Sequence, residues 1–204
     1  MAQTLKDEVK ERIVESAKRE FLTNGYEKSS VRSIAIRSHM TVGNLYRYFN
    51  SKEDLLRYIV SDTYGQLNEV VSKITNNEFT MSSDSVTALP VESLASAVEP
   101  LSMTLSGLYI NHPTELNILM MESDLNQSTV EWFTNVVIAT IDSFDPEMRS
   151  KEVLARAYST AIFNGAKEIL KTPDLDQETV RESLDVFFNS FLFMLQKGLT
   201  GEQE

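Results

Sequence analysis

The stretch from residue 28 to residue 50, KSSVRSIAIRSHMTVGNLYRYFN, constrains the fold more than any other part of the chain. It begins with Ser29 and Ser30, either of which can cap a helix by accepting a hydrogen bond from a free backbone N–H. The following apolar residues have the i, i+3, i+4 spacing of one buried helix face: Val31, Ile34 and Ala35. Ser38, His39 and Met40 interrupt this pattern, so we expect the first helix to end there.

A second short helix is predicted after the interruption. Thr41 is its predicted cap, and Leu45 and Phe49 lie four residues apart, which places them on one buried side. The rest of its surface would carry polar and aromatic side chains: Asn44, Tyr46, Arg47 and Tyr48. Asn pairs bidentately with adenine, Arg pairs with guanine, and hydroxyl groups bond phosphate oxygens. Two helices joined by a tight turn, with this face outward, predict a helix-turn-helix that binds DNA.

The same stretch resembles the helix-turn-helix of the tetracycline-repressor (TetR) family. The resemblance is carried by SSVR at 29–32, IA at 34–35, TVGNLYRYF at 41–49 and SKEDLL at 51–56, and it covers residues 8–60. Further along the chain the match is only a helical pattern.

Three positions depart from the family's pattern. His39 stands where the family usually has Gly, so a bend with positive φ is expected at a residue type that tolerates it. Val42 stands where a basic or polar residue is common, and it would contact a thymine methyl group instead of a phosphate. Ser33 replaces an acidic residue that often completes a capping box, so that box is weaker.

The resemblance implies an all-α regulator with a three-helix DNA-binding domain at the N-terminus and a helical body for ligand binding and dimerisation. Motif and resemblance together give these DNA-binding candidates: Ser30, Arg32, Thr41, Val42, Gly43, Asn44, Tyr46, Arg47, Tyr48 and Lys52. For Lys52 the resemblance suggests a phosphate contact, and the alternative is a solvated surface lysine. Gly43 would let the backbone approach DNA closely, at a cost in helix propensity.

The distribution of charge fits a DNA-binding N-terminus. The whole chain carries −11, but residues 1–60 hold 11 Lys and Arg and 8 Asp and Glu, a net of +3. The remainder holds 8 basic and 22 acidic residues, a net of −14. Attraction to phosphate depends on the local field within roughly 8–10 Å. An acidic body behind a basic domain therefore favours one orientation on DNA, although many soluble proteins are acidic simply for solubility.

Composition narrows the class further. The 204 residues include no Cys and only two His, His39 and His112, so a disulfide framework and a His or Cys metal cluster are not expected. No phosphate-binding glycine loop or nucleophile motif is present, so we predict that the protein is not an enzyme and holds no cofactor or metal. No run of about 18 apolar residues exists, and the N-terminus lacks a secretory pattern, which indicates a cytoplasmic protein.

Apolar periodicity predicts helices along the rest of the chain. Before the motif, a helix from Val9 to Thr23 would end at Gly25 as a left-handed cap. The three N-terminal helices would share a core of Ile13, Ala17, Phe21, Ile34, Leu45 and Phe49. After the motif, the capping box Ser51–Asp54 opens a linking helix over 51–74. Residues 75–88 read as a loop. The predicted domains are therefore 1–50, continued by the linking helix, and 75–204.

Several helices are expected in the second domain. One starts at Pro90 and is kinked or split at Pro100, and a short one follows the break at Asn111–Pro113. Another starts at Ser128 or Thr129 and reaches Phe144. The last two run over 150–171 and 176–198.

The final two helices are apolar on more than one face, so they need a partner, and docking against a second copy would form a four-helix interface. The TetR resemblance points to the same pair. The predicted interface residues are Ala157, Ala161, Phe187, Phe188, Phe191 and Leu195. The alternative is that the phenylalanines fill the core of a monomer.

A ligand cavity in the body is the remaining expectation. Its candidate lining residues are Tyr64, Met103, Leu105, Tyr109, Met120, Met121, Trp132 and Phe163, and ordinary core packing is the alternative for each. The predicted function is a transcriptional regulator whose dimer binds a palindromic operator as a repressor and is released by a small molecule. The alternative is a helical small-molecule or protein-binding module whose motif no longer binds DNA.

Overall fold

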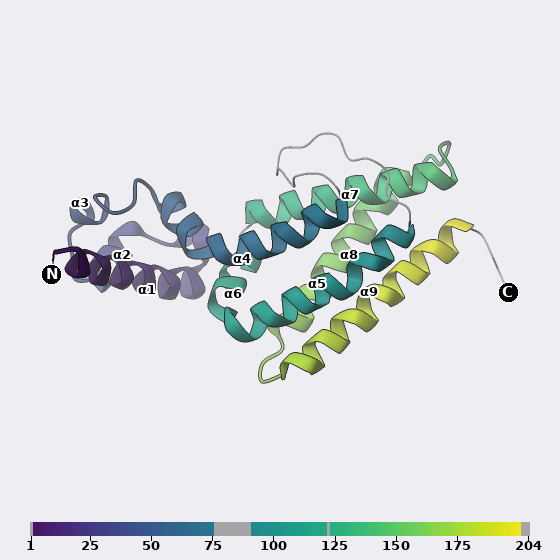
Figure 1. The fold of residues 1–204 in the computed structure, drawn as a ribbon. Coiled ribbons are helices and arrows are strands. Elements are labelled where there is room, and N and C mark those ends of the chain that lie inside the picture. Colours follow the sequence, from purple (N-terminus) through teal and green to yellow (C-terminus); the bar gives the residue numbers. More distant parts are fainter. Residues whose placement is uncertain (1, 76–90, 122, 201–204) are drawn as a thin grey trace. The chain divides into compact units, whose positions relative to one another are not determined.

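The protein is all-α over the residues that its computed structural model describes, 2–75, 91–121 and 123–200 (Figure 1). In chain order the helices are α1 (Ala2–Lys28), α2 (Val31–Arg37), α3 (Val42–Leu45), α4 (Lys52–Thr75), α5 (Val91–Asn111), α6 (Pro113–Met121), α7 (Ser123–Phe144), α8 (Lys151–Lys171) and α9 (Gln177–Thr200). Contacts divide the chain into an N-terminal unit, Met1–Tyr64 with His112–Ser123, and a C-terminal unit, Gly65–Asn111 with Asp124–Glu204.

The helix bounds follow the sequence predictions closely for α4, α6, α8 and α9. Other helices differ. α1 begins at Ala2 instead of Val9, α7 begins at Ser123 instead of Ser128 or Thr129, and α3 ends at Leu45. Of the two alternatives at Pro100, a split is excluded, because α5 continues through it as a single helix. Residues 76–88 of the predicted loop lie outside the described residues.

The N-terminal unit has the core that the sequence predicts. All six expected side chains are buried: Ile13, Ala17, Phe21, Ile34, Leu45 and Phe49. α1 contacts α2, and α2 contacts α3. At Gly25 the backbone leaves the helical region with φ 73°, a conformation that glycine adopts without steric cost, and α1 then continues as a short segment to Lys28.

A buried carboxylate, not anticipated from the sequence, joins α1 to α2. Glu20 is 3% exposed. Its Oε1 accepts a hydrogen bond from the backbone N–H of Ser30 at 3.3 Å, and its Oε2 lies 3.7 Å from a guanidinium nitrogen of Arg37. Because a buried carboxylate is costly without partners, these two contacts explain how α1 tolerates it and why α2 starts where it does.

α6 packs with the N-terminal unit, against the sequence-based boundary that would place it with residues 75–204. It contacts α1, and the Lys18 ammonium lies 2.7 Å from the Glu115 carboxylate. Burial alone would lower the pKa of Lys18, but hydrogen bonds to Glu115 and Glu15 outweigh it and raise the pKa. Burial would raise the pKa of Glu115, and the bond from Lys18 outweighs it and lowers the pKa.

This ion pair makes the stability of the N-terminal unit pH-dependent at the acid end. A carboxyl whose folded pKa lies below its ordinary value of 4.5 stabilises the fold above that value and loses its contribution as pH falls through the folded pKa. Lys18, raised above 10.5, contributes below 10.5 and loses its contribution only at higher pH. We therefore expect Glu115→Gln to lower Tm at pH 7, with a difference from wild type that shrinks by pH 3. Thermal unfolding followed by circular dichroism tests this, and a difference independent of pH would contradict it.

In the C-terminal unit α5, α8 and α9 contact one another and lie side by side (Figure 1). A buried cluster of Val137, Ile141, Ala155 and Leu195 joins α7, α8 and α9. At the turn between α8 and α9, the Tyr109 hydroxyl of α5 donates to the Thr172 carbonyl oxygen at 2.8 Å and accepts from the Leu175 N–H at 3.3 Å. The tyrosine thereby holds the α8–α9 turn against α5.

α8 and α9 pack tightly at Gly165. A Cβ atom placed there would lie 2.2 Å from Cζ of Phe187, so only glycine admits the ring in this position. We expect Gly165→Ala to lower the free energy of unfolding, because displacing the ring outweighs the roughly 1 kcal/mol that alanine gains in a helix. Gly107→Ala in α5 is the matched control, since nothing lies within 4 Å of its added Cβ, and it should stabilise. Urea unfolding measures both, and equal stabilisation would contradict the packing.

Candidate nucleic-acid interface

The first motif helix starts as the sequence predicts. Ser30 is the N-cap of α2 in extended conformation, and its Oγ accepts from the Ser33 N–H at 3.4 Å. Ser29, the other candidate, is buried and instead donates its hydroxyl to the Tyr26 carbonyl oxygen at 2.6 Å. The two serines therefore have different roles: Ser29 stabilises the preceding turn, and Ser30 caps the N-terminus of α2.

The turn between the motif helices depends on His39. Its φ of 58° confirms the positive φ expected where the family usually has glycine. The neighbouring backbone hydrogen bonds close the turn, from Met40 N–H to the Ala35 carbonyl at 2.9 Å and from His39 N–H to the Ile36 carbonyl at 3.1 Å. A non-glycine residue in this region is strained, and histidine is among those that adopt it most readily.

The second motif helix, α3, is shorter than predicted. Thr41 caps it by accepting from the Asn44 N–H at 3.2 Å, as expected, but the regular helix ends at Leu45. From Arg47 the backbone bonds tighten to i→i−3, with Arg47 N–H bonding the Asn44 carbonyl at 3.2 Å and Tyr48 N–H bonding the Leu45 carbonyl at 2.9 Å. Leu45 and Phe49 are buried beneath this segment.

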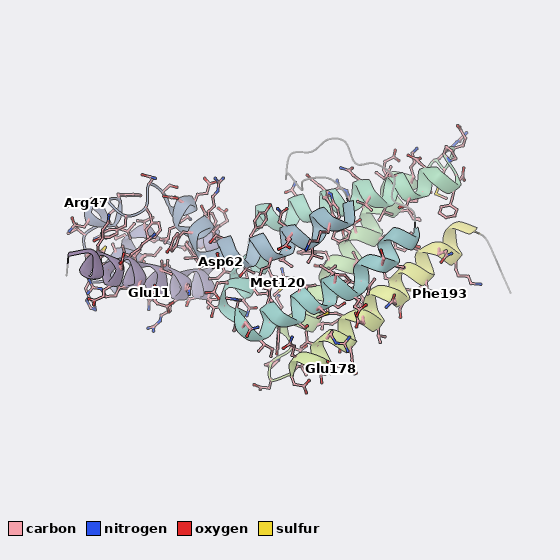
Figure 2. The ribbon with its side chains drawn as sticks, viewed as in Figure 1. Glu11, Arg47, Asp62, Met120, Glu178 and Phe193 are labelled. Carbon is pink, nitrogen blue, oxygen red and sulfur yellow. The ribbon has the colours of Figure 1, made fainter. Side chains whose placement is uncertain are left out.

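The burial pattern leaves a polar surface on this segment. Six of the predicted DNA-contact residues are exposed: Arg32, Thr41, Gly43, Asn44, Tyr46 and Arg47. Four are half-buried: Ser30, Val42, Tyr48 and Lys52. Figure 2 shows Arg47 at the outer edge of the N-terminal unit. Among the described residues no ion pair engages Arg32 or Arg47, so both guanidinium groups are available to an anion. Two packed helices that present Asn and Arg outward are typical of a helix-turn-helix DNA-binding surface.

The start of α4 fixes the far side of this surface. Ser51 Oγ accepts from the Asp54 N–H at 3.0 Å, which is the predicted cap. The return bond differs from a capping box, because Asp54 Oδ2 accepts from the N–H of Asn50, the residue before the cap, at 2.8 Å. The acidic side chains Glu53 and Asp54 occupy the first turn of α4, where the helix dipole favours negative charge.

Lys52 lies where the sequence suggests a phosphate contact, but its ammonium group is directed into the unit. Nζ lies 2.7 Å from the Tyr26 carbonyl oxygen and 3.4 Å from the carbonyl oxygens of both Glu27 and Ser29. It also lies 4.2 Å from the centroid of the Tyr26 ring. Sequence reasoning missed these contacts because the partners precede Lys52 by more than 20 positions.

Comparison with known proteins supports this interpretation. Residues 13–59 match the family model described as bacterial regulatory proteins, tetR family. Residues 13–59 are therefore a DNA-binding region of the tetR type, and the match lies on the N-terminal unit that carries the helix-turn-helix.

Solved structures extend the similarity to the fold of the whole chain. A TetR-like transcriptional regulator from Rhodococcus sp. RHA1 aligns over 95% of this chain and 97% of its own, with TM-score 0.53 and 16% identity. A transcriptional regulator from Aquifex aeolicus VF5 aligns over 89% of this chain and 98% of its own, with TM-score 0.48 and 22% identity. No curated protein matches the sequence.

The eight predicted ligand-binding residues are divided between the two units. Tyr64, Met120 and Met121 belong to the N-terminal unit, and the other five belong to the C-terminal unit: Met103, Leu105, Tyr109, Trp132 and Phe163. The side chains of Met103 and Met121 are exposed, whereas those of Leu105 and Met120 are buried. Burial raises the pKa of the Tyr64 phenol. Tyr109 already holds the α8–α9 turn, so packing accounts for it.

The predicted dimer residues also separate by burial. Ala157 and Ala161 are exposed on α8. In contrast Phe188, Phe191 and Leu195 are buried within the chain, and Phe187 packs over Gly165. Phe188, Phe191 and Leu195 therefore belong to the core of one copy, and Phe187 is half-buried. Among the described residues, the exposed large apolar side chains of α8 and α9 are Val153, Val186, Phe193 and Met194, none of which is in the predicted interface set.

Over the part of the chain that the structure describes, no group of three or more His, Cys, Asp or Glu is placed to hold a metal ion. In the same residues, no helix has the length and apolar character required to cross a membrane.

Proposed function

We propose that the protein is a repressor that binds a palindromic DNA operator as a homodimer and leaves it when a small molecule binds the helical body. The observation that carries the proposal is the exposed face of α3 and the turn after it, where Asn44 and Arg47 point outward while Leu45 and Phe49 are buried. Asn and Arg both make bidentate contacts to base edges in the major groove, so this face can read sequence.

The exposed apolar side chains of α8 and α9 support the dimer. Val153 is 75% exposed, Val186 67%, Phe193 61% and Met194 57%, which is unusual for four large apolar side chains on two adjoining helices. Pairing this face with its copy would bury them and fix two motifs on one rigid body. The dimer would require two half-sites related by two-fold symmetry, separated by about 34–36 Å along the duplex.

Repression and release by a ligand extend the family resemblance to this chain. Release requires a ligand that binds better to the state that does not hold DNA, since equal affinity for both states shifts nothing. The test is selection of duplexes from a random library by the purified protein, followed by footprinting. Enrichment of a palindrome protected on both half-sites is expected.

The second candidate function is a helical small-molecule or protein-binding module whose helix-turn-helix no longer binds DNA. The apolar, half-buried Val42 favours it, because the side chain offers no group to a phosphate. The same selection separates the two functions. The regulator is excluded if the protein enriches no sequence and binds duplex DNA no better than an acidic protein of similar size. That result would favour the binding module.

A further inference from the structure

The ammonium group of Lys52 occupies a site built from three backbone carbonyl groups. The chain leaves helical geometry at Gly25, with φ 73°, and the carbonyl oxygens of Tyr26, Glu27 and Ser29 then converge on one point. A lysine ammonium has three N–H donors, so these three oxygens match its full donor capacity. The Tyr26 ring lies 4.2 Å from Nζ, within the range of a cation–π contact.

The site adjoins the start of α2, where the candidate DNA contacts Ser30 and Arg32 lie. Ser29 contributes its carbonyl oxygen to Lys52 and its hydroxyl to Tyr26, and Ser30, the next residue, is the N-cap of α2. The Ser30 N–H is held in turn by the buried Glu20 carboxylate at 3.3 Å. The ammonium group of Lys52 from α4 and the carboxylate of Glu20 from α1 thus fix the position of the first turn of α2.

We propose that Lys52 is a positioning residue for DNA binding, which sets the α1–α2 turn and through it Ser30 and Arg32, and that it does not contact phosphate. The N–H donors of Lys52 are directed to carbonyl oxygens, so a phosphate would have to displace these oxygens to bind the ammonium group. Lys52 is also the first residue of α4, so a displacement at the start of α4 is passed directly to the start of α2. This inference rests on the proposed DNA-binding function.

The predicted consequence differs from that of a phosphate contact. Loss of one phosphate contact reduces the slope of log K against log salt by about 0.9, whatever the DNA sequence. A positioning residue leaves the slope unchanged and weakens binding to the preferred sequence. The Lys52→Arg substitution also separates the two roles. A planar guanidinium can bind a phosphate, but it cannot replace a single ammonium nitrogen that donates to three surrounding carbonyl oxygens.

The experiment compares Lys52→Met and Lys52→Arg with wild type and with the control Arg32→Met. Salt titrations use a 30-base-pair duplex of random sequence, and affinity is also measured for the duplex that wild type selects. Measurements are made well below each Tm and expressed per folded protein. We expect both Lys52 variants to bind the selected duplex about tenfold more weakly with an unchanged slope. Hydrogen exchange should be faster at the Ser30 and Ser33 amides. Arg32→Met should reduce the slope.

Two results would overturn the inference. A reduced slope in Lys52→Met with wild-type behaviour in Lys52→Arg would show a phosphate contact. Unchanged affinity per folded protein in both variants would show a purely structural lysine. If Lys52→Met does not fold, Lys52→Arg alone decides, since wild-type affinity for the selected duplex refutes positioning. A wild type that selects no duplex refutes the proposed function itself, and the inference with it.

Discussion

Arg47→Ala is expected to weaken sequence-specific DNA binding strongly without affecting the fold. The Arg47 side chain is exposed on the turn after α3, so its truncation removes no core packing. A bidentate contact to a base contributes about 1–3 kcal/mol, and a dimer loses two of them, which corresponds to a decrease in affinity of roughly 30-fold or more. Fluorescence anisotropy with the selected duplex measures the loss.

Arg19→Ala provides the control for this experiment. Arg19 is an equally charged, exposed residue of the same unit, but it lies on α1, outside the motif. Its removal changes net charge by the same amount, so a similar loss of affinity in both variants would indicate non-specific electrostatics in place of base recognition. A lower Tm in Arg47→Ala would show that the side chain serves the fold.

Met194→Glu is expected to convert the proposed dimer into monomers. Met194 lies on α9 beside the exposed Phe193. In a two-fold interface each copy would bury one carboxylate at this position, so the interface would contain two. Because an unpaired buried charge is strongly unfavourable, the dimer dissociation constant should rise at least about 100-fold. Sedimentation velocity over a concentration series measures it. DNA affinity should fall with it, since two linked motifs bind far more tightly than one.

Met103→Glu is a closely matched control. Both methionines are 57% exposed and belong to the C-terminal unit, but Met103 lies on α5. Met103→Glu should leave the mass measured by sedimentation velocity the same as that of wild type. Dissociation in both variants, or in neither, would rule out the α8–α9 face as the interface.

The sequence anticipated the features that depend on short-range pattern. The caps Ser30, Thr41 and Ser51 accept hydrogen bonds from residues three positions later, so both partners appear in one local motif. The positive φ at His39 follows from the need for a tight turn. The core of the N-terminal unit follows from helical periodicity alone, since the predicted apolar residues are those that are buried.

Contacts between distant residues were beyond such reasoning. Glu20 reads as one more surface acid of α1, and only the approach of Ser30 and Arg37 explains its burial. Periodicity also marks every apolar residue of α9 alike. It could not separate Phe188 and Phe191, which face the core of one copy, from Phe193, which faces outward, because that depends on where α5 and α8 lie.

The assignment of α6 to the N-terminal unit has a consequence for protein engineering. The chain passes from one unit to the other after Tyr64, after Asn111 and after Ser123, so no single junction separates them. A chimera that grafts residues 1–74 onto the body of another regulator would leave α1 facing a foreign α6, with Lys18 deprived of Glu115. Transplanting the DNA specificity of this protein therefore requires residues 112–123 to be carried across as well.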